Sequence, residues 1–177
     1  MLILAIDTST PTLVTGLVRD GVTVAERILP KCREQEERLV PCVQECLVEA
    51  DATFQDVTAI VVGCGPGPFT GLRVGMATAA AFGDALGVPV HGVCSLDAIA
   101  ERIDAPTVLV TTDARRREVY WAWYQDGRRV EGPSVQSPAE SFPQAHMVNV
   151  PEHLADKLSI EGAQRVDLDP SPASLVA

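Results

Sequence analysis

The sequence has few basic and few aromatic residues. Its 177 residues include 14 lysines and arginines against 24 aspartates and glutamates, which gives a net charge of −10. Aromatic residues make up only 5% of the chain. A chain this acidic repels a polyphosphate backbone, so tight binding of nucleic acid by the chain alone is not expected. A partner or a local basic patch would have to overcome that repulsion.

Long apolar runs and metal-binding motifs are also missing. No apolar run approaches the length that spans a membrane, and the apolar N-terminus has no preceding basic residues and carries Asp7 early, unlike a signal peptide. We therefore expect a cytoplasmic protein whose five cysteines are reduced. Cys42 and Cys46 share a predicted helix face, but no further ligands with zinc-like spacing accompany them. They are interpreted as core residues rather than metal ligands.

The chain is organised around a stretch rich in glycine and proline, Gly63 to Arg73. A β-branched apolar segment, 58–62, predicts a strand before it, and a run of small helix formers, 72–86, predicts a helix after it. Such an arrangement often presents backbone N–H groups to an anion. However, the stretch has no lysine for a Walker loop, and Pro68 stands where a dinucleotide fingerprint needs its last glycine. A rigid structural turn is the preferred interpretation, and an unusual anion site is the alternative.

One pattern of three strands occurs twice. A strand ends at Asp7 and a hairpin turn follows at Asp20, and the same order recurs with Asp113 and Asp126; the interval is 13 residues in both copies (7 to 20, 113 to 126). Between the copies lie two predicted helices and two predicted strands, residues 34–50, 58–62, 72–86 and 88–93. After the second copy a strand, a short helix and a strand are expected at residues 146–150, 151–158 and 163–168, with an unstructured end from 169. The second half therefore reads as a pruned copy of the first.

Small residues recur every four positions in the helix after the glycine-rich stretch, at Gly71, Gly75, Ala79, Gly83 and Gly87. This spacing places them on one helix face. Glycine inside a helix costs about 1 kcal/mol relative to alanine, so a structural reason for them is expected. The face either packs tightly onto the sheet or contacts a helix of another subunit, and the sequence leaves both interpretations open.

The candidate chemical groups are sparse. No nucleophile-elbow motif is present, and the three histidines have no metal-ligand spacing. Asp7 and Asp113 end equivalent strands, where they either face each other as carboxylates beside a hydrated metal or simply form turns. The one basic cluster comprises residues 115–117 with 128 and 129. It is interpreted as a solvated turn, with an anion or RNA contact as the alternative.

The duplication resembles the ribonuclease-H-like duplication of the actin and sugar-kinase (ASKHA) superfamily. This is an α/β fold of two lobes, here 1–104 and a shortened 105–177. Residues 5–9 (Ala-Ile-Asp-Thr-Ser), the glycine-rich stretch 65–75 and residues 113–120 are similar to the motifs of the TsaB (YeaZ) family. The similarity runs from the start of the chain to about residue 127.

The resemblance implies a non-catalytic scaffold or activating subunit in the synthesis of tRNA threonylcarbamoyladenosine. Such a subunit pairs with the catalytic paralogue TsaD and is joined by the ATPase TsaE. It meets tRNA only through the complex and forms a homodimer in isolation. No cofactor or metal is expected for the chain alone, although ATP or ADP has a place at the partner interface. The alternatives are a small ASKHA-type ATP-dependent kinase or ATPase, and a glycoprotease-like metallopeptidase.

The residues agree with a non-catalytic role. The His-x-x-x-His metal site of the paralogue falls on Ser95 and Ile99, which cannot replace imidazole ligands. No catalytic residue or metal ligand is therefore assigned. The weak candidates for nucleotide binding are Asp7, Thr8, Ser9, Gly65, Gly67, Thr70, Gly71, Arg73 and Arg115. The residues expected at the partner interface are Leu39, Val43, Leu47, Leu72, Gly75, Met76, Ala79 and Gly83.

Overall fold

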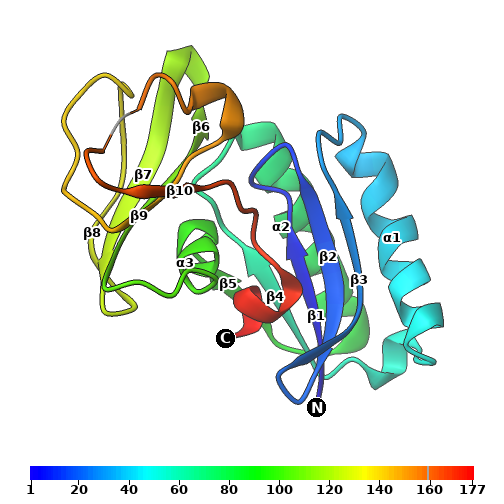
Figure 1. The fold of residues 1–177 in the computed structure, drawn as a ribbon. Helices are drawn as coiled ribbons and strands as arrows, with labels where there is room; N and C mark the ends of the chain where they lie inside the picture. Colours follow the sequence, from blue (N-terminus) through cyan, green and yellow to red (C-terminus); the bar gives the residue numbers. More distant parts are fainter. Residues whose placement is uncertain (159) are drawn as a thin grey trace.

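The first half of the chain forms a five-stranded mixed sheet (Figure 1). The computed structural model describes residues 1–158 and 160–177. The sheet has the order β3-β2-β1-β4-β5, with strands β1 (Leu2–Asp7), β2 (Leu13–Arg19), β3 (Val22–Leu29), β4 (Ala59–Gly63) and β5 (Val90–Val93). The first three strands are antiparallel, and β4 and β5 run parallel to β1.

The second half repeats this topology. Its strands are β6 (Thr107–Ala114), β7 (Glu118–Gln125), β8 (Arg128–Gln136), β9 (Met147–Asn149) and β10 (Gln164–Val166). The order β10-β9-β6-β7-β8 is the first order read from the other end, with β6 in the place of β1. Antiparallel and parallel pairings also correspond. The ribonuclease-H-like duplication predicted from the sequence is confirmed.

The helices are distributed unequally between the two halves. The α-helices are α1 (Gln35–Glu49), α2 (Phe69–Leu86), α3 (Ser95–Ala100) and α4 (Pro172–Val176), and the 3-10 helices are η1 (Phe54–Asp56), η2 (Arg115–Arg117) and η3 (Glu152–Leu154). Helices α1 and α2 cover one face of the first sheet (Figure 1). Among the described residues, the second sheet has no long helix in either corresponding connection, and the helix expected over 151–158 is only η3. Within those residues no helix has the length and apolar character that a membrane crossing requires.

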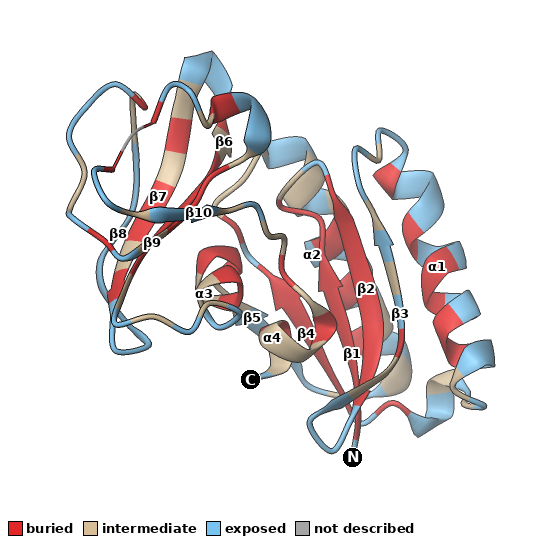
Figure 2. Ribbon diagram, in the orientation of Figure 1, coloured by how far each residue is buried: buried red, intermediate tan, exposed pale blue. Residues whose placement is uncertain are grey.

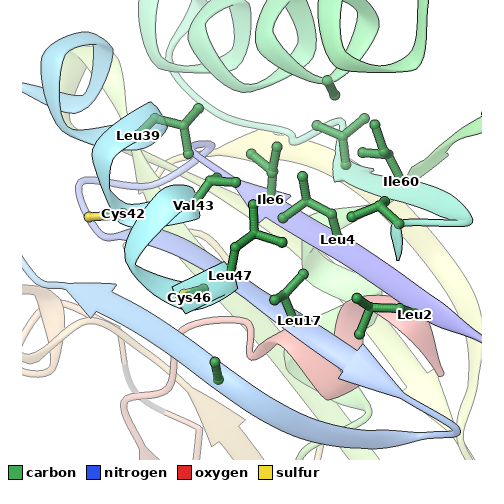
Figure 3. Close-up of a cluster of buried hydrophobic side chains, with 14 of the residues drawn as sticks. Leu2, Leu4, Ile6, Leu17, Leu39, Cys42, Val43, Cys46, Leu47 and Ile60 are labelled. Atoms are coloured by element: carbon green, nitrogen blue, oxygen red, sulfur yellow. The ribbon is translucent and has the colours of Figure 1, made fainter. Parts of the chain in front are cut away.

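The apolar stripe of α1 lies inside the protein. Figure 3 shows Leu39, Val43 and Leu47 gathered with Leu4 and Ile6 of β1, and all five are buried in one core cluster. Burying each such side chain contributes about 1.5–3 kcal/mol. The prediction that Leu39, Val43 and Leu47 form a subunit contact is therefore wrong, because the first sheet already covers them.

The small-residue face of α2 also packs within the chain. Gly75, Ala79 and Gly83 are buried. A Cβ added to Gly75 would lie 2.6 Å from Thr8 Oγ1, and one added to Gly83 would lie 2.3 Å from Val90 Cγ2. The stripe thus lets α2 approach the sheet closely, and its assignment to a partner interface is wrong. Of the predicted interface residues, Leu72 is half-buried and Met76 is exposed.

The C-terminal segment is ordered, contrary to the expected unstructured end. Ser171 and Ser174 form a reciprocal capping box at the start of α4, with Ser171 N donating to Ser174 Oγ at 2.9 Å and Ser174 N donating to Ser171 Oγ at 3.2 Å. Leu175 packs against Ile3 and other β1 side chains that alternate with those facing α1, so α4 covers the opposite face of the first sheet. The Ser-Pro-x-Ser sequence that caps this helix also resembles a turn.

Polar contacts join the two lobes at two places. Tyr124 Oη and Arg129 Nη1 from the second sheet donate to Asp97 Oδ1 on α3, at 2.7 and 3.0 Å. Burial, together with the Asp97 contact, raises the pKa of the Tyr124 phenol, so the hydroxyl stays a donor. At the second place Thr12 Oγ1 donates to Asp169 Oδ2 at 2.7 Å. These contacts fix the lobes against each other.

Candidate functional site

The glycine-rich loop is filled by the connection between β1 and β2. A Cβ on Gly67 would lie 2.0 Å from the carbonyl oxygen of Ser9, and one on Gly71 would lie 2.4 Å from that of Thr8. Thr8 Oγ1 donates to Gly71 O at 2.6 Å and accepts from Gly75 N at 2.9 Å. The loop and the first turns of α2 are therefore packed closely against the chain's own backbone at Thr8 and Ser9.

Asp7 lies at the centre of this arrangement and is 1% exposed. Its Oδ1 accepts from Ser9 N at 2.7 Å and its Oδ2 accepts from the Ser95 hydroxyl at 2.6 Å. Ser95 Oγ accepts from Gly65 N at 3.1 Å, and Ser95 N donates to Gly65 O at 2.8 Å. The carboxylate thus joins the end of β1 to α3 and to the glycine-rich loop. Burial raises the pKa of the Asp7 carboxyl, and hydrogen bonds from Ser9 and Ser95 offset part of this increase.

Asp7→Asn tests whether the carboxyl is a buried structural group. Because the pKa of the Asp7 carboxyl is raised above its ordinary value of 3.8, the folded state binds this proton more tightly than the unfolded state. Protonated Asp7 therefore stabilises the folded state below pH 3.8, and this contribution is lost as the pH rises through the folded-state pKa. Relative to wild type, the asparagine variant should therefore gain stability as the pH rises from about 4 to 7, measured by urea unfolding.

Asp56→Asn is the control, because the pKa of Asp56 is lowered where that of Asp7 is raised. The backbone N–H of Thr53 donates to the Asp56 carboxylate and lowers its pKa, so the contribution of Asp56 is lost as the pH falls through its folded-state pKa. The difference between wild type and this variant should shrink toward acid pH. Parallel stability curves for wild type and Asp7→Asn would contradict the role given to Asp7.

Three nucleotide-binding candidates, Thr70, Arg73 and Arg115, lie away from Asp7. Thr70 and Arg73 lie on the exposed side of α2, in a groove of about 400 Å³ that α2 forms with Glu36 of α1. The Arg73 guanidinium stacks over the Phe69 ring, 4.6 Å from its centroid. Arg115 belongs to the second lobe, at the turn between β6 and β7. The structure thus separates the candidates among an interior network, an outer groove and a hairpin turn.

A cavity of about 240 Å³ lies between the lobes. Asp113 lines it and its Oδ2 lies 3.1 Å from His153 Nε2. Asp7 does not line this cavity, so the alternative in which Asp7 and Asp113 face each other across a cleft is not supported. His153 and Asp169 are lining residues that the sequence did not predict. His153 follows β9, and β9 holds the position in the second sheet that β4 holds in the first. Its equivalence to the glycine-rich loop after β4 could have identified it as a site residue.

Ser95 and Ile99, the positions onto which the resemblance maps a His-x-x-x-His site, both lie in the interior of the protein. Ser95 belongs to the Asp7 network, and Ile99 is buried in a cluster that includes Val108 of the second sheet. Across residues 1–158 and 160–177, no group of three or more histidine, cysteine, aspartate or glutamate side chains is arranged to hold a metal ion.

Comparisons with known proteins give a consistent picture. The profile of the TsaD family, described as tRNA N6-adenosine threonylcarbamoyltransferase, matches residues 23–169. An uncharacterised protein of Mycobacterium tuberculosis is 52% identical over 180 residues, covering 99% of the chain and 83% of the relative. Escherichia coli TsaB, named as a tRNA threonylcarbamoyladenosine biosynthesis protein, is 38% identical over 130 residues, 71% of the chain and 55% of that protein.

The solved structure of YeaZ from Pseudomonas aeruginosa has the same fold. It superposes with a TM-score of 0.85 at 28% sequence identity, covering 99% of the chain and 88% of the neighbour. The chain spans 50% of the length of a Mycobacterium leprae relative and about half of the E. coli one. The motifs, the duplicated sheets and these matches agree, and the chain belongs to the TsaB (YeaZ) family.

Proposed function

We propose that the chain acts in the synthesis of tRNA threonylcarbamoyladenosine as a non-catalytic subunit that pairs with a TsaD-like paralogue. The names of its relatives support the process. The buried hydrogen bonds among Asp7, Ser95 and Gly65 support a non-catalytic role, because the Asp7 carboxylate and the Ser95 hydroxyl bind other groups of the chain. The observation that carries the pairing is the outer face of α2.

The outer face of α2 carries large exposed apolar side chains beside Thr70 and Arg73. Phe69 is 67% exposed and Met76 is 44% exposed, and they lie seven residues apart on one side of the helix. Alanines 77, 80 and 81 are also exposed and fill the space around them. Large exposed apolar side chains gathered on one helix face are typical of a protein–protein contact. These exposed side chains support a subunit contact on the outer face of α2, in place of the buried stripes.

The remaining parts of the proposal rest on the relatives' names and on the groove beside this face. The groove beside Phe69 offers the Thr70 hydroxyl and the Arg73 guanidinium, groups that suit an ATP or ADP phosphate at the partner interface. A TsaE-like ATPase joins the pair, and tRNA is met through the complex. Without its partner, the chain forms a homodimer through the same face. The site of action is the cytoplasm.

Met76→Arg tests the pairing. An arginine placed at the centre of an apolar contact leaves an unpaired charge, which costs about 3–5 kcal/mol. Affinity for the TsaD-like paralogue of the same organism should fall by about a hundredfold or more, measured by calorimetry or co-purification. The fold should be unaffected, because Met76 is already exposed.

Val130→Arg is the matched control, since Val130 is an exposed apolar residue of β8 in the other lobe. It should pair like wild type. In cells depleted of the protein, wild type and Val130→Arg should restore modified adenosine in tRNA, and Met76→Arg should not. Equal pairing of all three proteins would overturn the proposed contact.

A further inference from the structure

The turn between β6 and β7 carries arginines in an unfavourable backbone conformation. Ala114 pairs with Glu118, and residues 115–117 connect the two strands. The φ angles of Arg116 and Arg117 are 66° and 62°. This left-handed region costs about 1–2 kcal/mol for a residue with a Cβ, whereas glycine enters it freely. The chain therefore carries two arginines where glycine would stabilise the turn.

These arginines have no internal partner. All three guanidinium groups of residues 115–117 are exposed, and in the described part of the chain none donates a hydrogen bond or pairs with a carboxylate. The carboxylate of Asp113, just before the turn, already contacts His153 at 3.1 Å. Arg27, by contrast, contacts two glutamates. Among residues 1–158 and 160–177, no side-chain contact compensates for the strain in the turn.

The turn is also well placed to meet a large partner. It is the tip of the β6–β7 hairpin, which is coloured as exposed at the upper end of the second sheet (Figure 2). The chain as a whole carries a net charge of −10 and repels polyanions. A polyanion can approach such a surface only through a local, protruding positive group, and the arginine fork is the side chain best suited to phosphate oxygens.

We propose that Arg116 and Arg117 contact backbone phosphates of the RNA on which the complex acts. This inference rests on the proposed function, because the paired assembly brings the RNA to the turn. The contact positions the RNA and carries no sequence preference, as expected for phosphate contacts. The turn holds both residues at the exposed tip of the hairpin, where their side chains are free to meet a phosphate.

The double variant Arg116→Gly/Arg117→Gly tests the contact without disturbing the turn. Glycine adopts the observed φ angles more easily than arginine, so thermal stability should equal or exceed that of wild type. Binding of unmodified tRNA should weaken about tenfold at about 0.1 M salt, and the slope of log K against log salt should fall by about 2, one for each phosphate contact. Fluorescence anisotropy is measured for the chain alone and for the chain with its TsaD-like partner.

The control removes the same number of charges elsewhere. Arg19→Gln/Arg33→Gln replaces two exposed arginines of the first lobe, neither of which has an ion-pair partner among the described residues. It should bind tRNA like wild type. Pairing is measured first, so failure of the proposed function appears as absence of the complex. The inference is overturned if wild type binds tRNA no better than the double-glycine variant in both formats.

Discussion

Gly67→Ala should lower the free energy of unfolding by about 1–3 kcal/mol or more, a large part of the total stability of a small domain. The added methyl group would lie 2.0 Å from the carbonyl oxygen of Ser9, so backbone must move before it fits. Ser9 cannot move freely, because its N–H donates to the buried Asp7 carboxylate at 2.7 Å. The loss should appear as a lower midpoint in chemical unfolding with an unchanged slope.

Thr70→Ala is the control in the same stretch. Thr70 is exposed at the start of α2, so its replacement should change stability by no more than about 0.5 kcal/mol. If Gly67→Ala instead kept the stability of wild type and weakened nucleotide binding, the loop would be an anion site. Stability and nucleotide binding of Gly67→Ala thus distinguish a rigid structural turn from an anion site.

The glycine-rich loop shows what local pattern can predict. The strand before it and the helix after it were correct, because β-branched and small residues have clear preferences there. The helix begins at Phe69, three residues before the expected start, because Pro68 serves as the flanking residue. What the loop packs against was beyond prediction, because Thr8 and Ser9 lie almost sixty residues earlier in the chain.

The duplication shows the strength of repeated spacing. The equal intervals between aspartates predicted two similar sheets, and both have the same strand order. The surfaces of the helices were harder to assign. A stripe of leucine and valine, or of glycine and alanine, is equally compatible with the core and with a subunit contact. Periodicity identifies one face of a helix, and only the folded chain shows that Leu39 and Gly75 face the sheet while Met76 faces outward.

Leu39→Ala should lower the free energy of unfolding by about 2–5 kcal/mol, because it removes a side chain that is 0% exposed and leaves a cavity beneath α1. Val48→Ala on the same helix is the control. Val48 is 81% exposed, so its truncation should change stability by no more than about 0.5 kcal/mol. Both are measured by urea unfolding of the purified chain.

The same variant also separates the core from the docking face. At a temperature where Leu39→Ala is folded, its affinity for the TsaD-like partner should match that of wild type, since its own side chain cannot touch a partner through the sheet that covers it. Met76→Arg should show the reverse, with normal stability and lost pairing. If Leu39→Ala lost pairing and kept its stability, the stripe on α1 would be a subunit contact after all. The sheet would then have to move away from α1 when the partner binds.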